Sequence, residues 1–245
     1  MGGKIKFLTK FATSAAAVLL ALSITPNLAN AGGDIGYKDG PAPAGRTIWE
    51  GFHVGGHFGS GDADYDISQT TPASALATIR DGEDGFVGGF LYGSSWQFGQ
   101  WVLGTDSAYS FGDNKTGLNV AANGTSATAE IDWSSSTSLR AGYLVGQNVM
   151  LFGTLGVAFA NVDVAGTLIA GGSDDETAVG FVVGGGVEAA LSNRWFARVE
   201  YLHTDYGDEK FAEVGGGRFN VDLDTDVVRG VIGYRFDWSP LDLLR

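Results

Sequence analysis

The stretch that decides the fold is LRAGYLVGQNVMLFGTLGVAFANV, which runs from residue 139 to residue 162. It is apolar enough on average to suggest a membrane helix. Yet it contains four glycines (Gly142, Gly146, Gly153 and Gly156) and a polar Gly-Gln-Asn break. Each glycine inside a helix would cost about 1 kcal/mol relative to alanine. The stretch is therefore a poor helix, and a pair of strands is the better interpretation.

The same region alternates between apolar and polar residues with a period of two, as a strand does. Trp133, Leu139 and Tyr143 share one parity, whereas Ser138 and Arg140 share the other. The Val-Gly-Gln-Asn string that follows predicts a tight turn between two antiparallel strands. One face of this hairpin is apolar and aromatic, and the other is small, hydroxylic and charged.

Eight segments of about 10–14 residues repeat this alternation from Trp49 onward, which is an even count as in outer-membrane barrels. The sequence predicts short turns near residues 98–100, 146–148 and 192–194, and long polar links near residues 60–83, 112–130, 165–177 and 205–225. Short turns at one end and long loops at the other are typical of such barrels. We therefore expect an all-β fold, namely an eight-stranded antiparallel up-and-down transmembrane β-barrel.

A soluble barrel is the alternative, and it would turn its apolar face inward. Two features of the sequence favour the membrane instead. The residues of the charged parity are mostly Gly, Ser, Ala and Thr. These side chains are too small, and the charges among them too sparse, to form a solvated surface. The apolar parity carries Trp96, Trp101, Trp133 and Trp195 near segment ends, where an aromatic girdle would lie. Glycine on the inner parity would let eight strands curl around a narrow lumen.

The first 31 residues have the features of a secretory signal peptide. Lys4, Lys6 and Lys10 precede an apolar run, and Ala31 ends an Ala-Asn-Ala cleavage motif. An uncleaved anchor is the alternative, but the run is about 15 residues long and a spanning helix needs about 20. We expect the following organisation: signal peptide 1–31, periplasmic lead-in 32–48, outer-membrane barrel 49–238 and C-terminal tail 239–245.

Composition excludes several classes of protein. Removal of the signal peptide leaves 12 basic residues against 28 acidic ones, so the chain lacks the basic surface that nucleic acid requires. The chain has no cysteine and cannot be held by disulfides. Its 44% hydrophobic and 12% aromatic content is too high for a disordered chain.

Several strings resemble the small porin-like outer-membrane proteins of alphaproteobacteria. They are GGFLYGSSWQFGQWVLGTDSAYS, WSSSTSLRAGYLVGQNVMLFGTLGVAFA, GFVVGGGVEAALSNRWFARVEYLHTDYG and VRGVIGYRF, within residues 49–236. That family includes major surface antigens and hemin-binding proteins, and it belongs to the OmpA-like transmembrane barrel group. The resemblance implies an eight-stranded barrel in the bacterial outer membrane. Unlike the usual pattern, Phe236 is followed by a tail, DWSPLDLLR, which puts the usual terminal assembly signal in doubt.

Six charged residues of the inner parity lie within about seven residues of a periplasmic turn or of the end of the last strand. We therefore expect them at similar depth in the lumen, where buried charges are tolerated only if they are paired. This predicts an ion-pair network that plugs the barrel, although the same charges could serve only to hold the strands together. The six residues are Asp106, Arg140, Glu188, Arg198, Glu200 and Arg229.

We expect no catalytic residue, no bound cofactor and no bound metal. His53 and His57 share the inner parity, but positions i and i+4 of a strand are about 13 Å apart, too far to bind one metal ion together. The family resemblance leaves a hemin site open. The carboxylate-rich strings at residues 81–84 and 173–176 fall in predicted loops, and Ser107 and His203 have no evident third partner.

Outer-membrane lipid and lipopolysaccharide are the expected partners. The acidic loops could bind divalent cations that bridge to lipopolysaccharide phosphates, or they could be no more than a solvated surface. Peptidoglycan and other envelope proteins are further candidate partners. The expected function is structural, with a role in envelope integrity and surface display. A narrow porin-like channel or a hemin-binding transport protein is the alternative.

Overall fold

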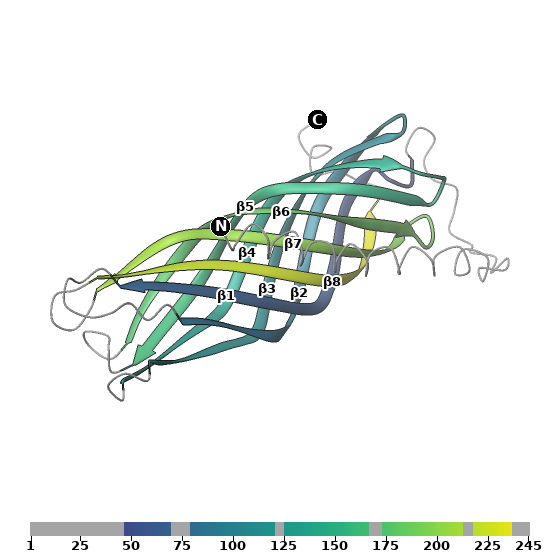
Figure 1. Ribbon diagram of the computed structural model, residues 1–245. Helices are drawn as coiled ribbons and strands as arrows, with labels where there is room; N and C mark the ends of the chain where they lie inside the picture. Colours follow the sequence, from purple (N-terminus) through teal and green to yellow (C-terminus); the bar gives the residue numbers. More distant parts are fainter. Residues whose placement is uncertain (1–46, 70–78, 121–124, 167–172, 213–217, 237–245) are drawn as a thin grey trace.

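The computed structural model describes residues 47–69, 79–120, 125–166, 173–212 and 218–236. Within these residues, eight long strands wrap into one closed barrel (Figure 1). None of the described residues belongs to a helix long and apolar enough to cross a membrane. The strands are β1 (Gly51–Gln69), β2 (Ile79–Phe98), β3 (Trp101–Val120), β4 (Thr125–Leu144), β5 (Val149–Gly166), β6 (Ser173–Ala190), β7 (Trp195–Ala212) and β8 (Arg218–Phe236).

Each strand runs antiparallel to its neighbours in chain order, and β1 closes the barrel by pairing with β8. At this seam Phe52 lies opposite Phe236, and His57 lies opposite Val231. Closure gives every strand a hydrogen-bonded neighbour on each side, as a structure in hydrocarbon requires. The predicted eight-stranded antiparallel up-and-down barrel is confirmed.

The three predicted short turns gather at one end of the barrel, on the right in Figure 1. They lie at Gly99–Gln100, Val145–Asn148 and Leu191–Arg194, close to the predicted positions. Gly99 has a φ of 63°, a conformation that glycine adopts without steric cost. In outer-membrane barrels the short turns face the periplasm, so the opposite end is extracellular.

The strands are longer than the sequence predicts, with 18 to 20 residues each. A tilted strand needs only about 10 residues to cross a bilayer, so each strand continues beyond it. Much of the four predicted loops is therefore strand, and the carboxylate-rich strings 81–84 and 173–176 lie in β2 and β6. The hydrophobic alternation stops at the bilayer boundary, whereas backbone pairing continues into water, and this is why the loop prediction was wrong.

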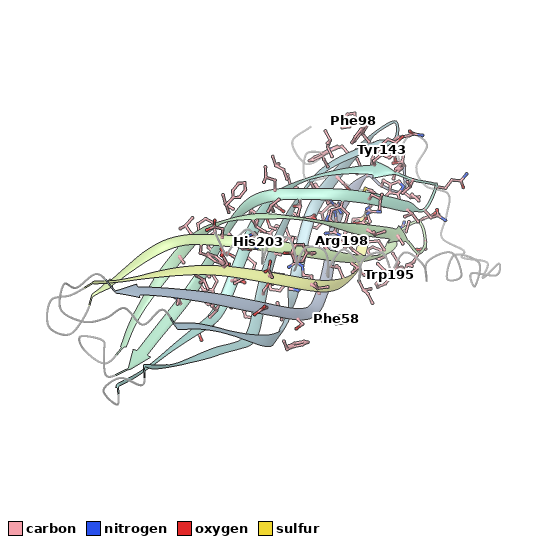
Figure 2. The ribbon with its side chains drawn as sticks, in the orientation of Figure 1. Phe58, Phe98, Tyr143, Trp195, Arg198 and His203 are labelled. Carbon is pink, nitrogen blue, oxygen red and sulfur yellow. The ribbon has the colours of Figure 1, made fainter. Side chains whose placement is uncertain are left out.

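The two faces of the wall differ as the alternation predicts. On β4, Leu139 is 67% exposed on the outer face, whereas its neighbour Arg140 is 3% exposed on the inner face. The outer face carries exposed aromatic side chains at both ends, including Trp101 and Trp195 near the short turns and Trp133 farther up. Figure 2 shows Phe98, Tyr143 and Trp195 around the short-turn end. An apolar outer face with aromatic ends is suited to lipid.

One irregularity shifts the register of β4. The pairing of β4 with β5 skips a residue between Ile131 and Trp133, and the pairing of β3 with β4 shifts near Phe111. As a result Ile131 is buried in the lumen, while Asp132 is exposed rather than inward-facing as strict alternation predicts. A bulge adds one residue to one strand, and this changes the face of the residues beside it.

Three layers of side chains fill the described lumen. An apolar cluster that includes Ile131, Val182, Leu202 and Tyr206 occupies the extracellular half. Buried charged residues lie below it. A third layer, built around Trp49 and Met150, lies at the short-turn end. The core of this barrel is therefore inside the wall.

Candidate functional site

The six charged residues predicted from the sequence all lie on the inner face, and each is at most 9% exposed. They come from five strands, β3, β4, β6, β7 and β8, and ion pairs join them. Figure 2 labels one of them, Arg198, which lies inside the barrel. The buried charges that the sequence distributes over 124 positions, from Asp106 to Arg229, thus form one cluster in space.

Glu188 is the centre of this cluster, because its carboxylate receives three guanidinium groups. Arg140 donates from Nη1 to Oε2 at 2.5 Å, and Arg198 donates from Nε to the same oxygen at 2.9 Å. Arg235 donates from Nη2 to Oε1 at 2.6 Å. Charge-assisted hydrogen bonds of this kind are stronger than neutral ones. They offset the large cost of burying the carboxylate.

Asp106, on β3, forms a second centre. Arg198 donates from Nη1 to Oδ2 at 2.8 Å, and Arg140 Nε lies 3.5 Å from the same oxygen. His53 donates from Nε2 to Oδ1 at 2.7 Å. Arg140 and Arg198 therefore link Asp106 to Glu188 across the lumen.

Glu200 and Arg229 extend the network toward the extracellular side. Arg229 donates from Nε to Glu200 Oε1 at 2.7 Å, and Arg198 Nη1 lies 3.5 Å from Glu200 Oε2. Arg198 thus contacts all three carboxylates. It also lies over the rings of Phe152 and Phe196, at 5.2 and 5.5 Å from their centres. Guanidinium groups gain from such contacts with aromatic rings.

Sequence reasoning left two members out of the network, His53 and Arg235. Both stand on the inner parity, which was the available signal, but their partners could not be assigned. Pairing of His53 with Asp106 spans β1 to β3, and pairing of Arg235 with Glu188 spans β8 to β6. Each contact passes over an intervening strand and depends on the stagger of the barrel, which hydrophobic alternation does not encode.

Glycines on β2 make room for the two inward histidines of β1. A Cβ at Gly93 would lie 2.8 Å from His53 Nε2, and one at Gly89 would lie 2.9 Å from His57 Nε2. His57 Nε2 lies 3.0 Å from the carbonyl oxygen of Tyr109 on β3. The histidines therefore reach across β2 to β3 because β2 has no side chains at those points. In the part of the chain that the structure describes, no group of three or more His, Cys, Asp or Glu is arranged to hold a metal ion.

Residues Thr47–Glu50, which we call the periplasmic cap, fold against the short-turn end of the barrel. Trp49 is 2% exposed, and its Nε1 donates to the carbonyl oxygen of Gln147 at 3.3 Å. Ser95 Oγ donates to the Trp49 carbonyl oxygen at 2.8 Å. Arg235 donates to the carbonyl oxygen of Ile48 and lies 5.4 Å from the Trp49 ring centre. The indole packs with Val102, Met150 and Phe152.

A separate polar group stands on the outer face of β7 and β8. Tyr201 donates from its hydroxyl to Asp226 Oδ1 at 2.5 Å, and His203 Nδ1 lies 2.8 Å from the same oxygen. Ser107, on the outer parity of β3, lies 3.1 Å from the hydroxyl of Thr137. Because β3 and β7 face each other across an eight-stranded barrel, Ser107 and His203 are not brought together.

Comparison with known proteins identifies the family. A family model described as outer membrane protein beta-barrel domain matches residues 14–240. The chain belongs to this family. A 22 kDa outer membrane protein of Rhizobium leguminosarum bv. viciae is 30% identical over 194 residues, which cover 79% of this chain and 80% of the relative.

Two further proteins are similar to the chain. A 31 kDa outer-membrane immunogenic protein of Brucella melitensis biotype 1 is 29% identical, with 80% of this chain and 87% of the relative covered. The outer membrane protein OprG of Pseudomonas aeruginosa is 16% identical with a TM-score of 0.44, over 76% of this chain and 96% of that structure. Both sequence relatives are named as outer-membrane proteins, not as enzymes. The chain is an outer-membrane β-barrel protein similar to alphaproteobacterial surface antigens.

Proposed function

We propose that this barrel is a closed structural protein of the outer membrane that supports the envelope and displays its extracellular ends. The observation that carries the proposal is the buried network across the lumen. Three carboxylates and four guanidinium groups, each at most 9% exposed, are joined by ion pairs across the full width of the barrel. A solute would have to separate these pairs in order to pass.

Two further layers support a closed lumen. The periplasmic cap places Trp49 over the short-turn end. Above the network, Ile131, Val182 and Leu202 bring apolar side chains together from different walls. Between Asp106, Glu200 and Arg229 there is a cavity of about 10 Å³, enough for roughly one water molecule.

Single-channel recording in planar bilayers tests the closure. We expect the processed protein to give no stable conductance of porin size. The triple variant Trp49→Ala/Glu188→Ala/Arg198→Ala, which removes the cap and the network centre, should conduct. The matched variant Leu139→Ala/Leu155→Ala, altered only on the lipid face, should stay closed. A porin-sized conductance of the unaltered protein would refute the proposed closed state.

A narrow channel is the second candidate, and the geometry of Glu188 is the observation that favours it. One carboxylate shared by three guanidinium groups can exchange partners without being left unpaired. Such an exchange could open a path for single ions only. In the same recordings, small and brief conductance steps that disappear in Glu188→Gln would favour this candidate over a closed barrel.

We further propose lipopolysaccharide as a partner of the extracellular ends, bridged by divalent cations. Support comes from the acidic strings at residues 81–84 and 173–176, which lie in the extracellular ends of β2 and β6. Oxygen ligands of this kind suit Ca²⁺ and Mg²⁺. Chelation with EDTA should release co-purified lipopolysaccharide. Retention of the lipid after chelation would contradict cation bridging.

Crosslinking in cells would test peptidoglycan and envelope proteins as further partners.

A further inference from the structure

The wall of the barrel is open between β6 and β7 at its extracellular end, which lies on the left in Figure 1. The last pair that joins these two strands is Phe181↔Asp205. β6 begins earlier, at Ser173, and residues 173–180 pair with β5. Among the residues that the structure describes, this stretch of β6 therefore has a paired strand on one side only. We call residues 173–180 the β6 edge.

A bulge in β7 accounts for the opening. The register of β7 against β8 shifts between Asp205 and Asp208. Within this bulge Gly207 has a φ of 69°, and its amide donates to Asp205 Oδ1 at 2.8 Å. A bulge bends its strand and increases the local twist. The bend lies where the pairing of β6 with β7 stops, and from Asp208 onward β7 pairs with β8.

A second opening lies between β2 and β3, whose pairing stops at Val87↔Gly112. Beyond this point β2 continues beside β1, and β3 continues beside β4. The described extracellular part of the wall therefore consists of two sheets, β3–β4–β5–β6 and β7–β8–β1–β2. The β6 edge borders the first of these sheets.

The β6 edge has the geometry that accepts a further strand. In an edge strand, every second residue directs its backbone N–H and C=O away from the sheet. Proteins bind extended segments through such groups by strand addition. The β6 edge is about 26 Å long at roughly 3.3 Å per residue, so it can pair with about eight residues of an extended segment.

The composition of the β6 edge selects its occupant. It contains Asp174, Asp175 and Glu176 and no Lys or Arg. The stretch of β7 across the opening, residues 206–212, adds two acidic residues and one basic residue. Pairing of the edge with a second copy of itself would bring like charges together, which opposes pairing. A basic segment is instead attracted to it.

We propose that the β6 edge binds an extended, basic segment of another protein by strand addition. The segment extends the β3–β4–β5–β6 sheet through backbone hydrogen bonds, and its basic side chains compensate the acidic residues of the edge. Binding requires neither an open lumen nor divalent cations. The proposal is therefore independent of the closed barrel and of the cation-bridged lipopolysaccharide proposed above.

Fluorescence anisotropy with the processed protein in phosphatidylcholine nanodiscs and EDTA tests this binding. The probe is a labelled peptide of about eight alternating lysine and threonine residues, the length of the edge. Its control carries the same side chains and charge but has an N-methyl group on every backbone amide. We expect the probe to bind about tenfold more tightly, because the control cannot donate backbone hydrogen bonds. Equal binding of the two peptides would overturn strand addition.

Hydrogen exchange and one variant locate the bound peptide. Backbone amides within residues 173–180 should exchange more slowly when the probe is added, and unchanged exchange there would contradict the site. Asp174→Asn/Asp175→Asn/Glu176→Gln, which neutralises the edge, should weaken probe binding about tenfold. Heat-modifiable gel mobility confirms that the variant folds.

Asp81→Asn/Glu83→Gln/Asp84→Asn is the matched control, since it removes the same number of acidic residues from β2 at the second opening. The strands beside that opening also carry Arg80 and Lys115, so a basic segment is attracted less strongly there. Probe binding should change less than about twofold. An equal loss of binding in both variants would show that the peptide responds to overall charge and not to the β6 edge.

Discussion

Glu188 is the carboxylate that three guanidinium groups share. Its replacement by Gln leaves Arg140, Arg198 and Arg235 facing one another without their shared carboxylate. We expect Glu188→Gln to lower the free energy of unfolding by about 3 kcal/mol, because breaking a buried pair strands the remaining charge. Urea-induced unfolding in lipid vesicles measures it.

Asp132→Asn is the matched control for this change, since Asp132 is exposed and outside the network. Its effect should stay within about 0.5 kcal/mol. If Glu188→Gln were as mild as the control, the network would not stabilise the barrel.

Gly93 shows why the inner parity holds glycine. An added Cβ would meet the backbone carbonyl oxygen of Thr105, as well as the Asp106 carboxylate and the His53 ring at 2.5 and 2.8 Å. Gly93→Ala should therefore destabilise the barrel by about 1–3 kcal/mol through overpacking. Gly146→Ala is the control, because a Cβ there has no atom within 4 Å. Equal unfolding midpoints for the two alanine variants would contradict the close approach of Thr105, Asp106 and His53 to Gly93.

The periplasmic cap is the element whose structure the sequence did not predict. The lead-in was predicted to end at residue 48 without periodic structure, yet Ile48 and Trp49 are held by Arg235, Ser95 and Gln147. These contacts involve backbone carbonyl groups and a single indole ring, and neither produces a periodic pattern in the sequence. An aromatic residue at a strand start can equally face lipid, so its burial had to be seen in the fold.

Cleavage by trypsin after Arg46 reports on the docking of the cap. Trp49→Ala removes the indole and should speed cleavage about tenfold, since local opening becomes easier. Trp101→Ala should not alter the rate, because Trp101 lies on the lipid face of the same end and is 55% exposed. Equal cleavage of the Trp49→Ala and unaltered proteins would show that Trp49 does not hold the cap.

Strand β8 completes the barrel at Phe236, which pairs with Phe52 of β1. A chain that ends at Phe236 should therefore still refold, because it keeps the β1–β8 pairing from Gln69↔Phe219 to Phe52↔Phe236. Heat-modifiable gel mobility of the truncated chain, compared with the full chain, checks this. Loss of the folded band would mean that refolding requires the tail in addition to the β1–β8 pairing.

For the molecule as a whole, the sequence predicts the wall better than it predicts the contents of the lumen. Alternation between Leu139 and Arg140 is enough to assign faces, and eight such segments are enough to close a barrel. The six charged residues were found because inner parity and distance from a turn fix their depth. Their ion-pair partners could not be predicted from the sequence, because the stagger of the strands decides that Arg198 meets Asp106 and that Arg235 meets Glu188.

The central claim is that one parity of every strand faces lipid and the other faces a closed lumen. The chain has no native cysteine, so single-cysteine spin labels can be placed along β4 without background. Labels at Leu139→Cys and Ala141→Cys should be accessible to oxygen dissolved in the bilayer, whereas labels at Ser136→Cys and Ser138→Cys should be shielded from both oxygen and a water-soluble nickel reagent. Alternating accessibility with a period of two is the predicted result. Accessibility of Leu139 and Ala141 to the water-soluble reagent, or the absence of alternation, would contradict the account.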